Sequence, residues 1–279
     1  MAGLLRRAAR SVLRALLPAG ARNSLNLLFA LDRPDAPPRP LGAFGPGRVM
    51  VLAPHMDDET GGCGGAIRKH ALAGGEVTLV YLTDGRRGNP DLYRQGLSPQ
   101  ELARAEAAHV ALRKEEAARA GRILGVKEIL YLDARDAELE PTPAIVTALR
   151  NLLRERRPEV VYLPSFMDVH ADHWATNRVL YAALTESPAP GGFVCRGYEL
   201  WTPLLANRVL DITDVVEVKR QALEQFESQL AHVDYVRTLL GLNAYRSIYF
   251  QRGRGYAEAF YECTPQVYRD LFERLTRRR

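Results

Sequence analysis

An apolar run leads directly into crowded acids: Arg48-Val49-Met50-Val51-Leu52-Ala53, then Pro54-His55-Met56-Asp57-Asp58-Glu59, then Gly61-Gly62-Cys63-Gly64-Gly65. The apolar run predicts a buried strand, and the glycines predict a turn that starts a helix. Crowded carboxylates repel one another and raise each other's pKa. A dication relieves that repulsion, so the segment predicts half of a metal site.

The order of short apolar strand and then helix repeats along the chain. Strands are expected at residues 48–53, 76–83, 128–133 and 160–164, and helices to about residue 73 and at 99–124, 143–156 and 171–184. A late strand pair at 198–203 and 208–212 and a final long helix at 214–230 are expected to follow. Repeated βαβ units predict an α/β fold with a mostly parallel sheet flanked by helices.

Ligands of such sheets bind at the carboxyl ends of the strands. The acids and histidines fall there, at residues 55–59, 84–88 and 168–173 and at Asp133 and Asp136. Because these loops come from one parallel sheet, we expect them to converge.

The second cluster is Asp168-Val169-His170-Ala171-Asp172-His173. Catalytic zinc takes three protein ligands of the imidazole and carboxylate type and keeps one open position. His55, one acid of the Asp57-Asp58 pair and one histidine of this cluster complete such a set, and spacing alone does not decide between the two aspartates. The groups left over, a carboxylate base and a histidine, predict hydrolysis of an amide-like carbonyl.

These segments resemble the LmbE-like (PIG-L) family of metal-dependent N-acetylglucosamine-type deacetylases. The family pattern is Pro-His-Pro-Asp-Asp-Glu with a Gly-Cys-Gly-Gly tail, and later His-x-Asp-His. This chain has residues 54–59, 62–65 and 170–173 at those places, with further agreement at 82–85, 112–117, 131–136, 198–203 and 253–258. The resemblance covers about residues 48–262 and implies a Rossmann-like α/β domain, which we place at residues 48–279.

The resemblance also implies roles for single residues. The zinc ligands would be His55, Asp58 and His173, although iron(II) suits such a site nearly as well. Asp57 would be the general base toward water. His170 would stabilise the oxyanion or protonate the leaving amine, oriented by Asp172, and Arg113 would contact substrate.

The substrate implied is a small N-acetylated sugar or a conjugate of one. Two alternatives stay open: an amidase acting on a non-sugar N-acyl compound, and a membrane-surface scaffold that keeps a metal for structure alone. Met56 departs from the family because it replaces a proline that would stiffen the loop. Glu59 is expected to lie behind the two aspartates, since three adjacent carboxylates cannot all reach one zinc.

The charge lies at the two ends of the chain. Residues 1–22 contain five arginines and no acid, and the chain ends in three arginines; without these eight cations, 30 basic residues face 33 acidic ones. A nucleic-acid groove needs basic residues over the folded surface, so no nucleic-acid partner is expected. Three scattered cysteines fit a reducing compartment, and a cytoplasmic location is expected.

Residues 1–47 are expected to form a basic amphipathic helix and a linker rich in proline and glycine. Leu5, Ala9, Val12, Leu13 and Leu16 share one face, and Arg6, Arg10 and Arg14 share another. Such a helix packs on its own domain or on a partner subunit, which would make a homo-oligomer. It is equally of the type that anchors a protein peripherally on anionic lipid through residues 1–22.

Overall fold

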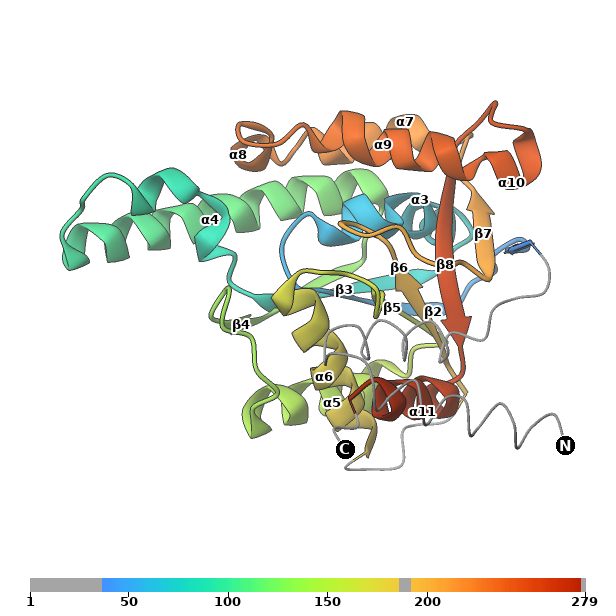
Figure 1. Ribbon diagram of the computed structural model, residues 1–279, viewed down its shortest axis with the longest axis horizontal. Helices are drawn as coiled ribbons and strands as arrows, with labels where there is room; N and C mark the ends of the chain where they lie inside the picture. The colour runs from blue at the N-terminus through green and yellow to red at the C-terminus, as the bar shows by residue number, and fades with distance from the viewer. Residues whose placement is uncertain (1–36, 186–191, 277–279) are drawn as a thin grey trace, which may run out of the picture.

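The computed structural model describes residues 37–185 and 192–276, which form one sheet with helices on both of its faces (Figure 1). The amphipathic helix expected near the N-terminus lies outside these residues. Within them, the strands are β1 (Arg39–Pro40), β2 (Arg48–Ala53), β3 (Glu76–Thr83), β4 (Glu128–Ala134), β5 (Val160–Pro164), β6 (Val194–Tyr198), β7 (Arg208–Asp211) and β8 (Ala257–Cys263).

The sheet is mostly parallel, as the strand and helix order predicted. Its strand order is β1-β7-β8-β6-β5-β2-β3-β4, and the run from β6 to β4 is parallel throughout. β8 lies antiparallel between β6 and β7. The expected α/β fold is confirmed, and the parallel run points the carboxyl ends of β2, β3, β4 and β5 to one edge.

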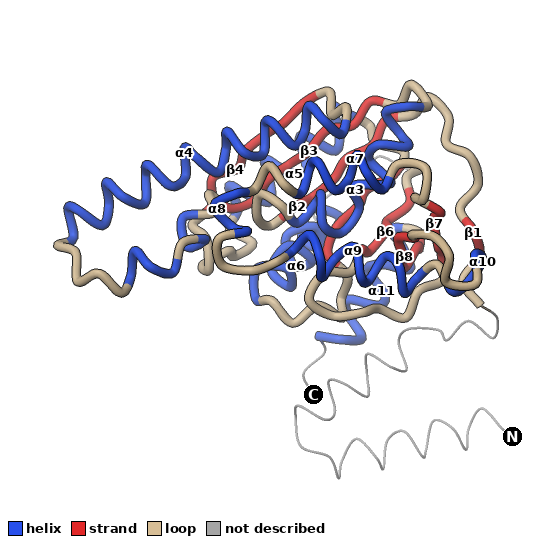
Figure 2. The backbone as a smooth tube through the Cα atoms, turned by 90° about the horizontal axis from the view of Figure 1, so that it is seen from above, coloured by secondary structure: helices blue, strands red, loops and turns tan. Residues whose placement is uncertain are grey.

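Two helical layers cover the sheet (Figures 1 and 2). One layer contains α3 (Asp58–Leu72), α4 (Pro99–Leu124), α7 (Val216–Leu223), α8 (Glu227–Leu230), α9 (Tyr235–Arg246) and α10 (Ile248–Gln251); the other contains α5 (Pro143–Arg156), α6 (Ala171–Thr185) and α11 (Pro265–Thr276). Each layer packs on the sheet through its own hydrophobic core, and alternate residues of β2 belong to different cores. Val49 and Val51 lie in the core under the first layer, and Met50 and Leu52 lie in the core under the second. This alternation is the normal consequence of strand geometry.

The C-terminal part differs from the sequence expectation. The strand expected at residues 198–203 is wrong, because β6 ends at Tyr198 and β7 pairs with β8 rather than with β6. The chain leaves the sheet where the Glu199 carboxylate accepts hydrogen bonds from the Arg246 side chain and from the backbone N–H of Leu204.

The long helix expected at residues 214–230 is likewise wrong. It is divided into α7 and α8 at Phe226, whose backbone has a non-helical ψ of 54° while its ring is buried. Three further helices follow it, α9, α10 and α11.

Part of the expected linker lies against the sheet. β1 pairs with β7, and Phe44 stacks on His70 with ring centroids 3.8 Å apart. Loop segments η1 (Arg86–Gly88) and η2 (Pro90–Tyr93) connect β3 to α4. Among the helices of residues 37–185 and 192–276, none combines the length and the apolar character that crossing a membrane requires.

Candidate metal centre and active site

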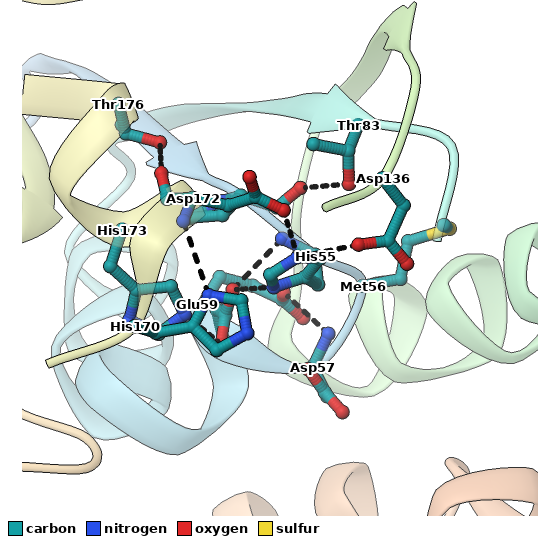
Figure 3. A network of polar contacts seen from close by, with 12 residues as sticks. His55, Met56, Asp57, Glu59, Thr83, Asp136, His170, Asp172, His173 and Thr176 are labelled. Atoms are coloured by element: carbon teal, nitrogen blue, oxygen red, sulfur yellow. Dashed lines mark hydrogen bonds and ion pairs between the residues drawn. The ribbon is translucent and has the colours of Figure 1, made fainter. Parts of the chain in front are cut away.

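The acidic and histidine loops converge at the carboxyl edge of the sheet (Figure 3). His55 follows β2, Asp136 follows β4, and His170 and His173 lie where β5 passes into α6. The ligand atoms of His55, His170 and His173 lie within 4.8 Å of one another, and so do those of His55, Asp136 and Asp172. The topology therefore brings together the two clusters that the sequence set far apart.

The Asp58 carboxylate lies between two of these histidines. Its Oδ2 is 3.1 Å from His55 Nδ1, and its Oδ1 is 3.3 Å from His173 Nε2. Donor atoms of a tetrahedral zinc with bonds of about 2.1 Å are about 3.4 Å apart, which is close to these separations. Both ring nitrogens of His173 are buried without a well-directed hydrogen bond among the described residues. The two contacts use different oxygens of Asp58. His55, Asp58 and His173 offer donor atoms of the type that zinc takes, and their role as its ligands stays a prediction.

Carboxylates also lie beside the ring nitrogens of His55 and His173 that do not face Asp58. His55 Nε2 lies 3.1 Å from Asp136 Oδ1 and 3.1 Å from Asp172 Oδ2, and His173 Nδ1 lies 3.2 Å from Asp168 Oδ2. Such partners fix the orientation of metal-binding histidines and raise their basicity. The sequence placed Asp136 and Asp168 at strand ends but assigned them no role, because only the fold shows which ring each one meets.

The carboxylates of the cluster favour positive charge on the histidines between them. Burial alone lowers the pKa of His55, but hydrogen bonds to Asp136, Asp172 and Asp58 outweigh it and leave that pKa well above its ordinary value. Burial also opposes the charge on His173, yet Asp58 and Asp168 raise its pKa to about 9. Without metal, protons on these rings balance the surrounding carboxylates. A dication supplies the same balance and leaves the histidines neutral.

Asp57 is held in a rare backbone conformation beside Asp58. Its φ is 137° and its ψ is −25°, a region that a residue with a side chain occupies only under constraint. The constraint is visible: its N–H donates to Glu59 Oε2 at 3.1 Å, and its carbonyl accepts from Gly61 N–H at 2.8 Å. Burial raises the pKa of Asp57 to about 6, against the opposing influence of Arg113.

Glu59 lies on the other side of this turn. It is fully buried, accepts a hydrogen bond from Thr60 Oγ1 at 2.6 Å, and holds the Asp57 N–H as described. Burial raises the pKa of Glu59 to about 7. Its hydrogen bond to the Asp57 N–H places Glu59 against the backbone of the turn that carries Asp57.

Arg113 reaches this turn from α4. Its side chain is 2% exposed, its Nη2 donates to the Met56 carbonyl oxygen, and the same atom is 3.4 Å from Asp57 Oδ2. Its Nε and Nη1 are buried and have no hydrogen-bond partner among the described residues. Met56 itself is fully buried in the core, so packing and Arg113 hold the loop in place of the family's proline.

His170 and Asp172 meet through the backbone. The Asp172 N–H donates to His170 Nδ1 at 3.2 Å, whereas the Asp172 carboxylate accepts from the N–H groups of Ala137 at 2.9 Å and Leu139 at 3.3 Å and contacts His55. The contact between Asp172 and His170 thus runs through the main chain, and the role of Asp172 in orienting His170 stays a prediction. Burial lowers the pKa of His170, and the neighbouring histidines lower it further.

A buried ion pair between Lys219 and Glu258 contacts the backbone of α3, the helix that begins at Asp58. α3 is broken at Cys63, which has a non-helical φ of −147°. Lys219 Nζ donates to the Gly61 carbonyl at 2.8 Å, and its partner Glu258 accepts from the N–H groups of Gly65 at 2.7 Å and Ala66 at 2.8 Å. The pair therefore satisfies backbone groups on both sides of the break. Both side chains are fully buried.

A cavity of about 610 Å³ opens over these groups. His55, Asp57, Asp58, Asp136 and His170 form its polar floor. Arg87 and Arg113 also line it, together with residues of α7, α8, α9 and the loop after β6. A cavity of this size accepts a ligand of drug size, since such pockets measure roughly 300–1,000 Å³.

Known proteins share this fold and these motifs. The family model for PIG-L, GlcNAc-PI de-N-acetylase, matches residues 50–184. Diacetylchitobiose deacetylase of Thermococcus kodakarensis is 32% identical over 196 residues, which make up 65% of this chain and 70% of that protein. This chain belongs to the PIG-L family.

A solved PIG-L-like structure agrees in architecture. N,N'-diacetylchitobiose deacetylase from Pyrococcus horikoshii, complexed with its inhibitor MPG, matches with a TM-score of 0.67 and 27% sequence identity. The match covers 80% of this chain and 85% of the deacetylase chain. The expected family, its α/β fold and the N-deacetylase class of enzyme are confirmed.

One relative carries out a different reaction. The 4-oxalmesaconate hydratase of Pseudomonas putida is 28% identical over 247 residues, which make up 80% of this chain and 92% of that protein. Its name identifies a hydration rather than an amide hydrolysis. An experiment on this chain must therefore test the bond as well as the substrate.

Proposed function

We propose that this protein is a zinc-dependent hydrolase that removes the N-acetyl group from an amino sugar or its conjugate. The observation that carries the proposal is the Asp58 carboxylate placed between His55 Nδ1 and His173 Nε2, with Asp57 and His170 in the lining of the same cavity. A zinc ion held by His55, Asp58 and His173 would polarise the amide carbonyl and lower the pKa of water at neutral pH.

Asp57 is the proposed general base. Its pKa of about 6 leaves its carboxylate ionised at neutral pH, and the carboxylate lines the cavity. A base of this pKa can take a proton from attacking water near its operating pH. The strained backbone and the contact with Arg113 hold the carboxylate in one place, so it needs no reorganisation before the proton transfer.

His170 is proposed to hold the carbonyl oxygen as a hydrogen-bond donor. Because its Nδ1 accepts the Asp172 N–H, the neutral ring carries its proton on Nε2. That N–H can donate to the developing oxyanion. The lowered pKa keeps the ring neutral, so it serves as a hydrogen-bond donor, and the proton that Asp57 takes from water is the one that passes to the leaving amine.

Arg113 is proposed to bind the substrate beside the base. A buried guanidinium with two unpaired nitrogen donors is costly, because unsatisfied buried donors lose their hydration. An acceptor oxygen on the substrate would satisfy them, and Arg113 lines the cavity.

The test is a substrate panel with the zinc-loaded protein, scored by release of free amine. It contains N-acetylglucosaminides, N-acetylated non-sugar amines, and 4-oxalmesaconate followed by its ultraviolet absorbance. Amine release from the sugars above all others supports the proposal. Preference for non-sugar amides would make the protein an amidase, hydration would place it with the hydratase, and no turnover with retained zinc would favour a scaffold.

The matched variants are Asp57→Asn and Asp133→Asn. The first should keep zinc and lose about 10³-fold or more in kcat, the range seen for essential groups. The second removes an exposed acid at the end of β4 that pairs with Lys114, and it should retain activity. Near-normal turnover in Asp57→Asn would refute the assignment of the base.

A further inference from the structure

One group of residues that line the cavity is apolar, and we call it the apolar wall: Leu200 and Trp201 after β6, Leu223 of α7, and Tyr235, Leu239 and Leu242 of α9. Gln229, His232 and Thr238 line the same cavity and are polar. Sugar hydroxyls placed against aliphatic side chains would lose hydration without gaining hydrogen bonds. A plain oligosaccharide therefore leaves this wall without a suitable partner.

Helix α9 presents three different faces. Leu240, Asn243 and Arg246 are buried against the protein, where Asn243 donates to the Ala257 carbonyl and Arg246 pairs with Glu199. Arg237 and Tyr245 are exposed to solvent. The third face, which lines the cavity, carries Thr238 together with Tyr235, Leu239 and Leu242, and the last three have the spacing of a core stripe. Residues with core spacing that face a cavity indicate a bound apolar group.

The apolar wall begins next to the metal centre. A Cβ atom added at Gly61 would lie 2.8 Å from Leu200 Cδ2 and 2.8 Å from Leu239 Cδ1, so both side chains rest on the first turn of α3. Asp58 starts that turn. An apolar group on this wall would therefore be continuous with a sugar on the catalytic floor.

The wall ends in an aromatic pair at the surface. Trp201 is 53% exposed, and its ring meets that of Tyr235 edge to face with centroids 6.1 Å apart. The backbone N–H of Trp201 donates to Asp168 Oδ2 at 3.2 Å, and the same carboxylate contacts His173. The main chain at the aromatic end of the wall is thus linked to the candidate metal centre through Asp168.

We infer that the substrate is an amphiphilic conjugate, an N-acetylated amino sugar that carries an apolar aglycone, and that the aglycone lies along the wall from Leu239 to Trp201. This inference rests on the proposed function. The acyl group removed in the proposed reaction is an acetyl group. The apolar part of the substrate must therefore be the group joined to the sugar.

The experiment measures binding separately from turnover. Methyl and hexyl 2-amino-2-deoxyglucosides of the same anomer are titrated calorimetrically into the zinc-loaded protein. The hexyl compound should bind at least about 10-fold more tightly, because each buried methylene contributes several-fold. Equal affinities would overturn the inference.

Variants of α9 locate the effect. Leu242→Ser should reduce the hexyl preference to about 3-fold or less, since it removes apolar area from the wall. Leu242→Met, which keeps the wall apolar, and Tyr245→Ser, on the exposed face of the same helix, should retain the preference. Equal loss in Tyr245→Ser and Leu242→Ser would also overturn the inference.

A second arm compares the N-acetyl and N-hexanoyl forms of the methyl glycoside. Tighter binding of the N-hexanoyl form, with no preference among the aglycones, would assign the wall to the acyl chain and contradict the inference. If the hexyl preference holds but no N-acetyl compound releases amine, the proposed deacetylation fails while the apolar subsite stands.

Discussion

The backbone N–H of Asp172 donates to Nδ1 of His170 at 3.2 Å, and this one bond decides which nitrogen of the His170 ring carries the proton in the neutral state. A main-chain donor cannot rotate away as a side chain can. His170 therefore presents a fixed N–H at Nε2 in the cavity that Asp57 also lines.

Replacing His170 tests this arrangement. His170→Gln should lower kcat by about 10²–10⁴-fold, the range for loss of an oxyanion donor or of a general acid. Zinc content, measured by mass spectrometry of the purified protein, should be unchanged because His170 is not one of the three proposed ligands. Loss of zinc in this variant would move His170 into the ligand set.

Removing the metal should abolish the reaction. After chelation and dialysis, amine release should fall by at least about 10²-fold, and stoichiometric zinc should restore it. Iron(II), added without oxygen, is the comparison ion because the site also suits it. Full activity in a chelated sample verified to be metal-free would contradict the proposed mechanism.

Asp168 is expected to act through His173. Asp168→Asn weakens the charged partner of His173 Nδ1, so zinc should bind about 10–100-fold more weakly. Competition with a chromophoric chelator measures this affinity. At saturating zinc, kcat should recover most of its normal value, a pattern that general destabilisation of the fold would not produce. Asp133→Asn serves as the control.

The buried pair of Lys219 and Glu258 should matter greatly to stability. Lys219→Met leaves Glu258 without its buried cation and should cost about 3–5 kcal/mol of unfolding free energy in urea. The double variant Lys219→Met with Glu258→Gln should lose less than the sum of the two single losses. The matched surface change Lys69→Met, in a pair with the exposed Asp214, should cost about 1 kcal/mol or less.

His70 should make stability depend on pH. Burial lowers its pKa to about 3, and the nearby charge of Arg196 adds to the shift, so the folded protein keeps this ring neutral. Its contribution to stability is complete above the ordinary histidine pKa of about 6.5 and is lost as pH falls toward 3.

Protonation of His70 can change the unfolding free energy by at most about 1.4 kcal/mol per pH unit. His70→Gln should flatten the acid side of the curve of unfolding free energy against pH between 4 and 6.5, whereas the exposed His232→Gln should leave it unchanged. An identical acid slope in wild type and His70→Gln would show that other groups control it.

Local patterns predicted most of the parallel sheet and the meeting of the two acidic and histidine clusters at its edge. The strands at 48–53, 76–83 and 160–164 and the helices at 99–124 and 143–156 begin and end where the sequence placed them. Strong apolar runs and clear caps decide such elements locally; the Ser98 side chain, for example, accepts the N–H of Glu101 at the start of α4. After residue 198, the strand expected at 208–212 is present as β7, whereas the strand expected at 198–203 and the single helix expected at 214–230 are not.

The sequence alone determined that carboxylates and histidines would meet at one edge of a parallel sheet, because strand direction carries every strand-end loop there. Only the tertiary structure decided the partners: Asp136 and Asp172 on His55, Asp168 on His173, and Glu258 of β8 at the break in α3. It also decided that a face of α9 with core spacing lines a cavity. These contacts join residues that are far apart in the chain, so no local pattern predicts them. The apolar periodicity of a helix shows which of its faces is apolar, but not what that face contacts.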